Sequence, residues 1–156
     1  MKKALVLVDI QNDFCPGGAL PVAEGDMVVD PSNRLIEHCI SRGMPVYFTR
    51  DWHPADHCSF RDQGGEWPSH CVAGTPGAAF HPRLTVPASA VIVSKAERRD
   101  AEAYSGFAGT GLAGELRKQG VDSLVVAGLA TDYCVKNTVL DALREGFAVM
   151  VVREAI

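Results

Sequence analysis

The chain has 156 residues, of which 47% are hydrophobic and 22% are charged, and its net charge at pH 7 is −4. This length and composition predict one globular domain, residues 1–156. The absence of any lysine or arginine cluster excludes typical nucleic-acid and anionic-membrane binders, and no apolar run approaches the ~20 residues of a membrane span.

The cysteines and the N-terminus indicate a cellular compartment. Five cysteines at irregular spacings do not form the pattern of a disulfide framework. The N-terminal apolar run is too short for the core of a signal peptide. We therefore expect a protein of the reducing cytoplasm.

Apolar runs that read as strands alternate with amphipathic stretches that read as helices. We expect strands at residues 4–8, 45–49, 90–94, 123–127 and 147–152, and helices at residues 30–42, 111–119 and 132–145. Unbroken apolar strands that alternate with helices are typical of a parallel sheet covered on both faces. The pattern predicts an α/β fold, a three-layer αβα sandwich with a central, mainly parallel sheet. A covering helix is expected after the last strand, so we expect a truncated C-terminus.

The amphipathic stretches also predict which side chains face the core. The apolar stripe of the first helix is expected to contain Leu35, Ile36, Cys39 and Ile40. The stripe of the third helix is expected to contain Val135, Thr138, Val139, Ala142 and Leu143.

Four of the expected strands end in residues that can do chemistry. These are Asp9, Asp51 together with His53, Lys95, and Cys134 just beyond the fourth strand. In open α/β sheets the ligand crevice lies beyond the carboxyl ends of the strands. We therefore expect these side chains to converge on one volume of space.

Cys134 follows a strand and falls in the first turn of a helix. Unpaired N–H groups and the helix dipole favour a thiolate there, and such sites lower a cysteine pKa to between ~3.5 and ~7.5. A nucleophilic thiol needs a base, a cation and an oxyanion hole. Asp9, Lys95 and the amides around Ala130 and Cys134 could supply them. Each residue also fits a simpler role, as a turn carboxylate, a solvated lysine or a packed thiol.

The Asp51-x-His53 pair suggests a metal site. Both side chains point to one face if the strand continues, and a carboxylate with an imidazole suits Zn²⁺, Fe²⁺ or Mn²⁺. His57 and His70 lie in the following loop, and either could complete the set. A capping aspartate next to a surface histidine is the simpler alternative.

Aromatic side chains occur in loops at the same edge of the sheet. Phe14, Trp67 and Tyr104 could form walls for a flat ring substrate, although core packing under a long loop would explain them equally well.

These motifs together resemble those of the nicotinamidases (pyrazinamidases) in the isochorismatase-like cysteine hydrolase superfamily. The matching segments are residues 9–14 (DIQNDF), 51–54 (DWHP), 67–71 (WPSHC), Lys95, 104–107 (YSGF) and 128–134 (GLATDYC). The resemblance covers essentially the whole chain. It implies an isochorismatase-like, Rossmann-like fold, and a cytoplasmic hydrolase that converts nicotinamide to nicotinate and ammonia in NAD salvage, and also takes pyrazinamide.

The resemblance also implies the role of each site residue. Asp9, Lys95 and Cys134 match the catalytic triad, with Ala130 and Cys134 forming the oxyanion hole at a cis peptide between Leu129 and Ala130. Asp51, His53 and His70 match the ligands of one divalent metal ion, with zinc as first choice and iron or manganese as alternatives. His57 is a candidate extra ligand. The residues that match the substrate pocket are Phe14, Leu20, Trp67, Tyr104 and Leu129.

Two other readings compete with this one. The first is a metal-free relative that acts on another amide or carbamoyl substrate, against which His53 and His70 count. The second is a non-enzymatic metal-binding or thiol redox module, against which the lack of any C-x-x-C motif counts. The expected partner is a small molecule, with neither nucleic acid nor membrane, and self-association into a homo-oligomer is compatible with the sequence.

Overall fold

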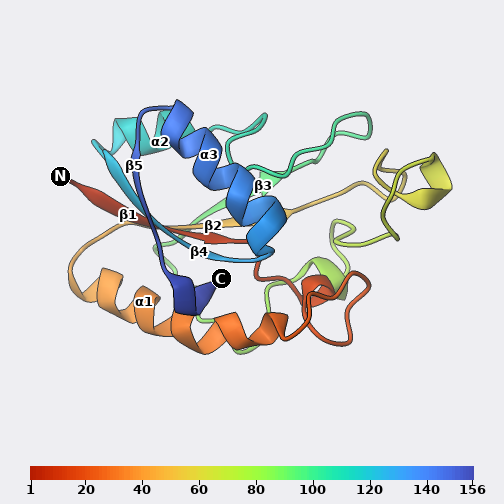
Figure 1. Ribbon diagram of the computed structural model, residues 1–156, viewed down its shortest axis with the longest axis horizontal. Coiled ribbons are helices and arrows are strands. Elements are labelled where there is room, and N and C mark those ends of the chain that lie inside the picture. Colours follow the sequence, from red (N-terminus) through yellow and green to blue (C-terminus); the bar gives the residue numbers. More distant parts are fainter.

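The computed structural model describes residues 1–156 as a three-layer α/β/α sandwich (Figure 1). Its sheet has five parallel strands in the order β3-β2-β1-β4-β5. The strands are β1 (Lys3–Val8), β2 (Val46–Asp51), β3 (Val91–Lys95), β4 (Ser123–Gly128) and β5 (Ala148–Val151). The predicted class, strand number and approximate strand positions are confirmed.

Helices cover both faces of the sheet. In Figure 1, α1 (Val29–Ser41) lies on one side, and α2 (Leu112–Lys118) and α3 (Lys136–Arg144) lie on the other. Two hydrophobic clusters fill the spaces between the layers. One holds Ile36 of α1 with Leu5 and Leu7 of β1, and the other holds Leu116 of α2 with Val6 of β1. Alternate residues of β1 thus face opposite layers, which explains its unbroken apolar sequence. None of the helices has the length and apolarity that a membrane crossing requires.

Two predicted core positions are wrong. Ile40 at the end of α1 and Leu143 near the end of α3 are exposed, whereas the residues directly before them, Cys39 and Ala142, are buried. Each helix therefore still packs on the sheet in its last turn, and the predicted stripe is one residue too wide at that end. The edge strand β3 is also half open to solvent, with Val91 and Ile92 exposed, because no second strand flanks it.

The predicted helix at residues 132–145 is divided in two. Residues Thr131–Val135 form a π-helical turn, and regular α-helix begins only at Lys136. In the wide turn, the N–H groups of Tyr133 and Val135 both donate to the Ala130 carbonyl, at 3.2 and 3.1 Å. Such wide turns occur frequently at functional sites. Here the turn carries Cys134 at the end of β4.

Gly128 is the residue at which β4 leaves the sheet. It pairs with Val8 of β1 and has φ +116°, a conformation that side-chain-bearing residues rarely adopt. A Cβ on Gly128 would also collide with the Val8 carbonyl oxygen. Close approach of the two backbones at this point brings the ends of β1 and β4 together.

The substitution Gly128→Ala is expected to lower the free energy of unfolding by about 2–4 kcal/mol, from the strained φ and the backbone collision together. Urea unfolding followed by circular dichroism measures it. Gly114→Ala is the matched control, because Gly114 lies within α2 with open space around it, and alanine should stabilise the helix by about 0.5–1 kcal/mol. Equal unfolding midpoints for wild type and Gly128→Ala would contradict this account of the β1–β4 contact.

Candidate active site

Lys95 lies at the centre of a buried cluster formed by the ends of the strands. Its Nζ is 2.9 Å from Asp9 Oδ2 and 2.5 Å from Asp51 Oδ1. The same ammonium donates hydrogen bonds to the Ala103 carbonyl at 3.1 Å and to Cys134 Sγ at 3.6 Å. A lysine without solvent exposure needs such partners to remain charged. The four residues that the sequence places at strand ends therefore do meet in space.

The strand registers explain this meeting. Asp51 and Lys95 are direct partners in the parallel pair of β2 and β3, and Asp9 follows Val8, which pairs with Thr49. The Thr49 hydroxyl donates to Asp9 Oδ1 at 2.7 Å and so orients the carboxylate. Thr49 was not singled out from the sequence; a threonine near the end of an otherwise apolar strand was the available signal.

Gln11 supports Asp51 through the backbone. Its amide accepts from Asp51 N and donates to Asp51 O, both at 2.8 Å, and also donates to Ala78 O at 2.9 Å. The side chain is fully buried. A buried glutamine with its hydrogen bonds satisfied in this way holds the end of β2 in place. Gln11 belongs to the DIQNDF segment, but its role there depends on contacts 40 residues away.

Cys134 differs from the sequence-based expectation in its acidity. Burial raises the pKa of the thiol well above its ordinary value, and Lys95 lowers it only in part, because Asp9 and Asp51 raise it further. The prediction of a lowered pKa at a helix start is therefore wrong for this environment. Desolvation and two nearby carboxylates outweigh the helix terminus, so the resting thiol is protonated and needs a base.

Asp9 has the properties of that base. Burial raises the pKa of its carboxyl group, although Lys95 acts in the opposite direction, so Asp9 holds a proton more readily than an ordinary carboxylate. Its Oδ2 forms an ion pair with the Lys95 ammonium, 2.9 Å away. Carboxylate oxygens of Asp9 and Asp51 and Cys134 Sγ all lie within 4.8 Å of one another. The Asp9 carboxylate is therefore close to the thiol.

Asp51, His53 and His70 form a second group with the chemistry of a metal site. Their ligand atoms lie within 4.8 Å of one another, with Asp51 Oδ2 3.5 Å from His53 Nε2 and 3.9 Å from His70 Nε2. Each Nδ1–H donates to a carbonyl, Ala96 O at 3.0 Å for His53 and Pro68 O at 2.7 Å for His70. These bonds leave both Nε2 lone pairs free for a ligand, as is usual for metal-binding histidines.

The surroundings of His53 Nε2 show whether a metal ion would fit between these three side chains. This nitrogen is buried and has no hydrogen-bond partner, which is unfavourable unless a ligand satisfies it. One carboxylate and two imidazoles form an oxygen and nitrogen donor set that suits a divalent transition metal with open positions. The alternative trio of Asp9, Asp51 and Cys134 does not fit a metal, because the Lys95 ammonium already contacts all three.

His57 does not join this site. Its Nε2 is 3.0 Å from the Ala101 carbonyl, so this nitrogen carries the proton, and its Nδ1 accepts from the Ser59 hydroxyl at 2.7 Å. The ring stacks on His53 with centroids 4.2 Å apart. With both nitrogens engaged, His57 supports the orientation of His53 rather than acting as the extra ligand that the sequence suggested.

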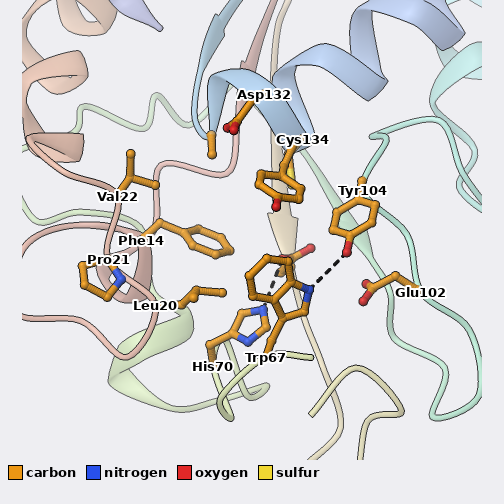
Figure 2. A pocket seen from close by; sticks show the side chains of 13 residues that line it. Phe14, Leu20, Pro21, Val22, Trp67, His70, Glu102, Tyr104, Asp132 and Cys134 are labelled. Atoms are coloured by element: carbon orange, nitrogen blue, oxygen red, sulfur yellow. Dashed lines mark hydrogen bonds and ion pairs between the residues drawn. The ribbon is translucent and has the colours of Figure 1, made fainter. Parts of the chain in front are cut away.

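A cavity of about 210 Å³ opens beside both groups (Figure 2). Phe14, Leu20, Trp67 and Tyr104 line it as predicted, and the Trp67 Nε1–H donates to the Tyr104 hydroxyl at 3.1 Å. Lining residues that sequence reasoning missed are Pro21, Val22, Glu102, Asp132 and Tyr133. Asp51, His70, Ala130 and Cys134 complete the wall, so a flat ring in the cavity would meet the thiol and the candidate metal ligands together.

The peptide bond between Leu129 and Ala130 is cis, as the resemblance implied. Ala130 lines the cavity next to Cys134, and its N–H makes no backbone hydrogen bond. Leu129 does not line the cavity, contrary to its assignment as a substrate contact. Its side chain is 1% exposed and packs in the hydrophobic core, because the bend at the strand end turns it inward.

Comparisons with known proteins identify the family and the fold. Residues 3–156 match the family model described as the isochorismatase domain. The chain is 47% identical to the nicotinamidase of Escherichia coli K12, over 97% of this chain and 81% of that protein. It is 42% identical to the nicotinamidase/pyrazinamidase of Mycobacterium tuberculosis, over 96% and 83%. A crystal structure of the Pyrococcus horikoshii pyrazinamidase in complex with zinc superposes with a TM-score of 0.97 at 51% identity, over 100% of this chain and 86% of that one.

Proposed function

The chain belongs to the isochorismatase family, and from that premise we propose that it hydrolyses nicotinamide to nicotinate and ammonia. One observation carries the proposal: the thiol of Cys134 borders the same ring-sized cavity as Asp51 and His70, which form a ligand trio with His53. Three metal ligands beside a nucleophile favour hydrolysis of a ring amide, because a site with a thiol alone has nothing to hold the ring. The nicotinamidases and pyrazinamidases among its relatives support nicotinamide, and pyrazinamide as a second substrate.

In the proposed first half-reaction, the Asp9 carboxylate accepts the thiol proton and the Cys134 sulfur attacks the carboxamide carbon. Lys95, 3.6 Å from Sγ, stabilises the developing thiolate. The carbonyl oxygen becomes an oxyanion that the amides of Ala130 and Cys134 would bind. Loss of one such donor in other enzymes costs about 2.7–4 kcal/mol. When the C–N bond breaks, Asp9 returns its proton to the leaving nitrogen, and ammonia departs from a Cys134 thioester.

The second half-reaction consumes water. Asp9 accepts a proton from the water molecule, whose oxygen attacks the thioester carbon. The C–S bond then breaks, Asp9 returns the proton to the thiolate, and the carboxylic acid that forms loses its proton to water and leaves as nicotinate. Each step uses a single carboxylate alternately as base and acid, which suits a residue with a raised pKa.

Asp51, His53 and His70 would hold one divalent ion, for which we propose zinc on the strength of the zinc-bound relative. When bound, the ion supplies a Lewis acid that can take the pyridine nitrogen and fix the ring. Phe14 and Trp67 would enclose the ring. A cytoplasmic location is part of the proposal, and it is supported by five cysteines that are all free.

Ammonia release from nicotinamide, measured with and without a chelator, tests the function. The purified protein is expected to hold about one equivalent of zinc, iron or manganese, to release ammonia, and to lose this activity when the metal is removed. His53→Ala and His70→Ala should both lose metal, whereas His38→Ala on the exposed face of α1 should keep it. Undiminished activity in a metal-free preparation would point instead to a metal-free hydrolase of another amide or carbamoyl substrate.

A further inference from the structure

Two carboxylates on the cavity wall play no part in the proposed reaction. Glu102 and Asp132 both line the cavity and both are exposed. Figure 2 shows Glu102 beside Tyr104, and Asp132 on the turn that carries Cys134. Neither forms a salt bridge. No lysine or arginine lines this cavity. Arg98 borders a neighbouring pocket together with Glu102, but its guanidinium pairs with Asp100 instead.

These two carboxylates decide the sign of the charge that a bound ring would meet. In the buried cluster, Lys95 faces the carboxylates of Asp9 and Asp51, which leaves one negative charge. A divalent ion would turn this into one net positive charge, which would retain a carboxylate. Glu102 and Asp132 together restore one net negative charge around the cavity. Because Glu102 and Asp132 are exposed, their influence on a bound ring is moderate and depends on the salt concentration.

We propose that Glu102 and Asp132 determine the charge specificity of the cavity, which accepts neutral carboxamides and repels both amides that carry a carboxylate and the carboxylate product. This inference rests on the proposed function and adds the substrate class to it. The two residues act at a distance, through their charge, and make no bond to the reacting atoms. Glu102 and Asp132 would speed the release of product, because hydrolysis converts a neutral ligand into an anion that the two carboxylates repel.

The inference is tested by titration calorimetry on the zinc-loaded protein, which measures binding without turnover. The probes are nicotinate, which is an anion, and pyridine, which is a neutral ring. Glu102→Gln is expected to tighten nicotinate binding about threefold to tenfold, and Asp132→Asn by a similar factor. Pyridine binding should stay unchanged in both variants. At about 1 M salt, where the Debye length is ~3 Å, the gain for nicotinate should largely disappear.

Glu97→Gln is the matched control, because Glu97 is an exposed glutamate five positions before Glu102 and does not line this cavity. It should leave nicotinate binding unchanged. Hydrolysis of maleamate, an amide that carries a carboxylate, should be slow in wild type and should rise relative to nicotinamide in the double variant Glu102→Gln with Asp132→Asn.

Three results would overturn the inference: unchanged nicotinate binding in Glu102→Gln, an equal change for pyridine and nicotinate, or an equal gain in Glu97→Gln. A wild-type protein that binds nicotinate with the expected charge dependence but releases no ammonia from nicotinamide would overturn the proposed function alone. The two failures are therefore distinguishable.

Discussion

Cys134→Ala is expected to reduce ammonia release from nicotinamide by about 10⁴–10⁶-fold, as loss of the nucleophile does in other hydrolases. No other thiol can replace it, because Cys134 is the only cysteine that lines the cavity. Replacing the cysteine with alanine removes only the sulfur atom and leaves a small void next to Lys95 and Val135, so the variant should fold. Ammonia release by the purified variant, compared with wild type at saturating nicotinamide, measures the loss.

Metal content separates this loss from a collapse of the site. Cys134 is not part of the Asp51, His53 and His70 trio, so the alanine variant should keep its equivalent of metal while losing activity. Cys58→Ser is the matched control, since Cys58 is a free, partly exposed cysteine outside the cavity, and it should retain wild-type rates. Ammonia release that survives in Cys134→Ala would falsify the nucleophile assignment. Loss of metal in that variant would show that the thiol has a structural role.

The sequence was sufficient to predict where Asp9, Asp51 and Lys95 meet. Parallel strands end at the same edge of the sheet, so residues that follow apolar runs are brought together by topology alone. The acidity of Cys134 could not be predicted in this way. It depends on how deeply the thiol is buried and on how far it lies from two carboxylates and one ammonium, and these distances exist only in the folded chain.

The loops were harder to predict than the strand ends. His57 and His70 are equally plausible ligands from spacing, and only the contacts of His57 with Ser59 and Ala101 separate them. Glu102 and Asp132 were overlooked because each resembles an ordinary solvated acid in the sequence. The π-helical turn was missed because its hydrophobic pattern matches that of an α-helix. In each case the decisive information is a contact between segments that local periodicity does not encode.

Backbone conformation adds a constraint that residue types do not reveal. Asp9, Cys71 and Ala96 all have positive φ, between 47° and 51°, and each one is a site residue or directly follows one. Side-chain-bearing residues in this region store strain of about 1–3 kcal/mol, which the surrounding structure must offset. The offsetting contacts are visible at Ala96, whose carbonyl accepts the His53 Nδ1–H, and at Cys71, whose N–H donates to Asp13 Oδ2 at 2.8 Å. Strained positions thus hold the first and third strand ends and the His70 loop in register.

Lys95→Met is expected to abolish activity and to lower the free energy of unfolding by about 3–5 kcal/mol, the range found when one partner of a buried ion pair is removed. Methionine fills a similar volume but leaves Asp9 and Asp51 without their shared cation. The two carboxylates would then repel each other in a site that is nearly closed to solvent. Urea unfolding of the protein at a fixed zinc concentration measures the change. Lys118→Met, at an exposed position near the end of α2, should cost less than about 1 kcal/mol.

A double variant distinguishes lost charge pairing from lost packing. In Lys95→Met with Asp9→Asn, one of the two repelling charges is gone, so part of the stability should return although activity should not. The double-variant cycle should therefore show a coupling of about 1–3 kcal/mol, as for residues in one buried network. Additive losses would mean that Lys95 contributes mainly through packing of its alkyl chain. Recovery of activity in the double variant would contradict the role of Asp9 as the base, because an amide cannot accept the thiol proton.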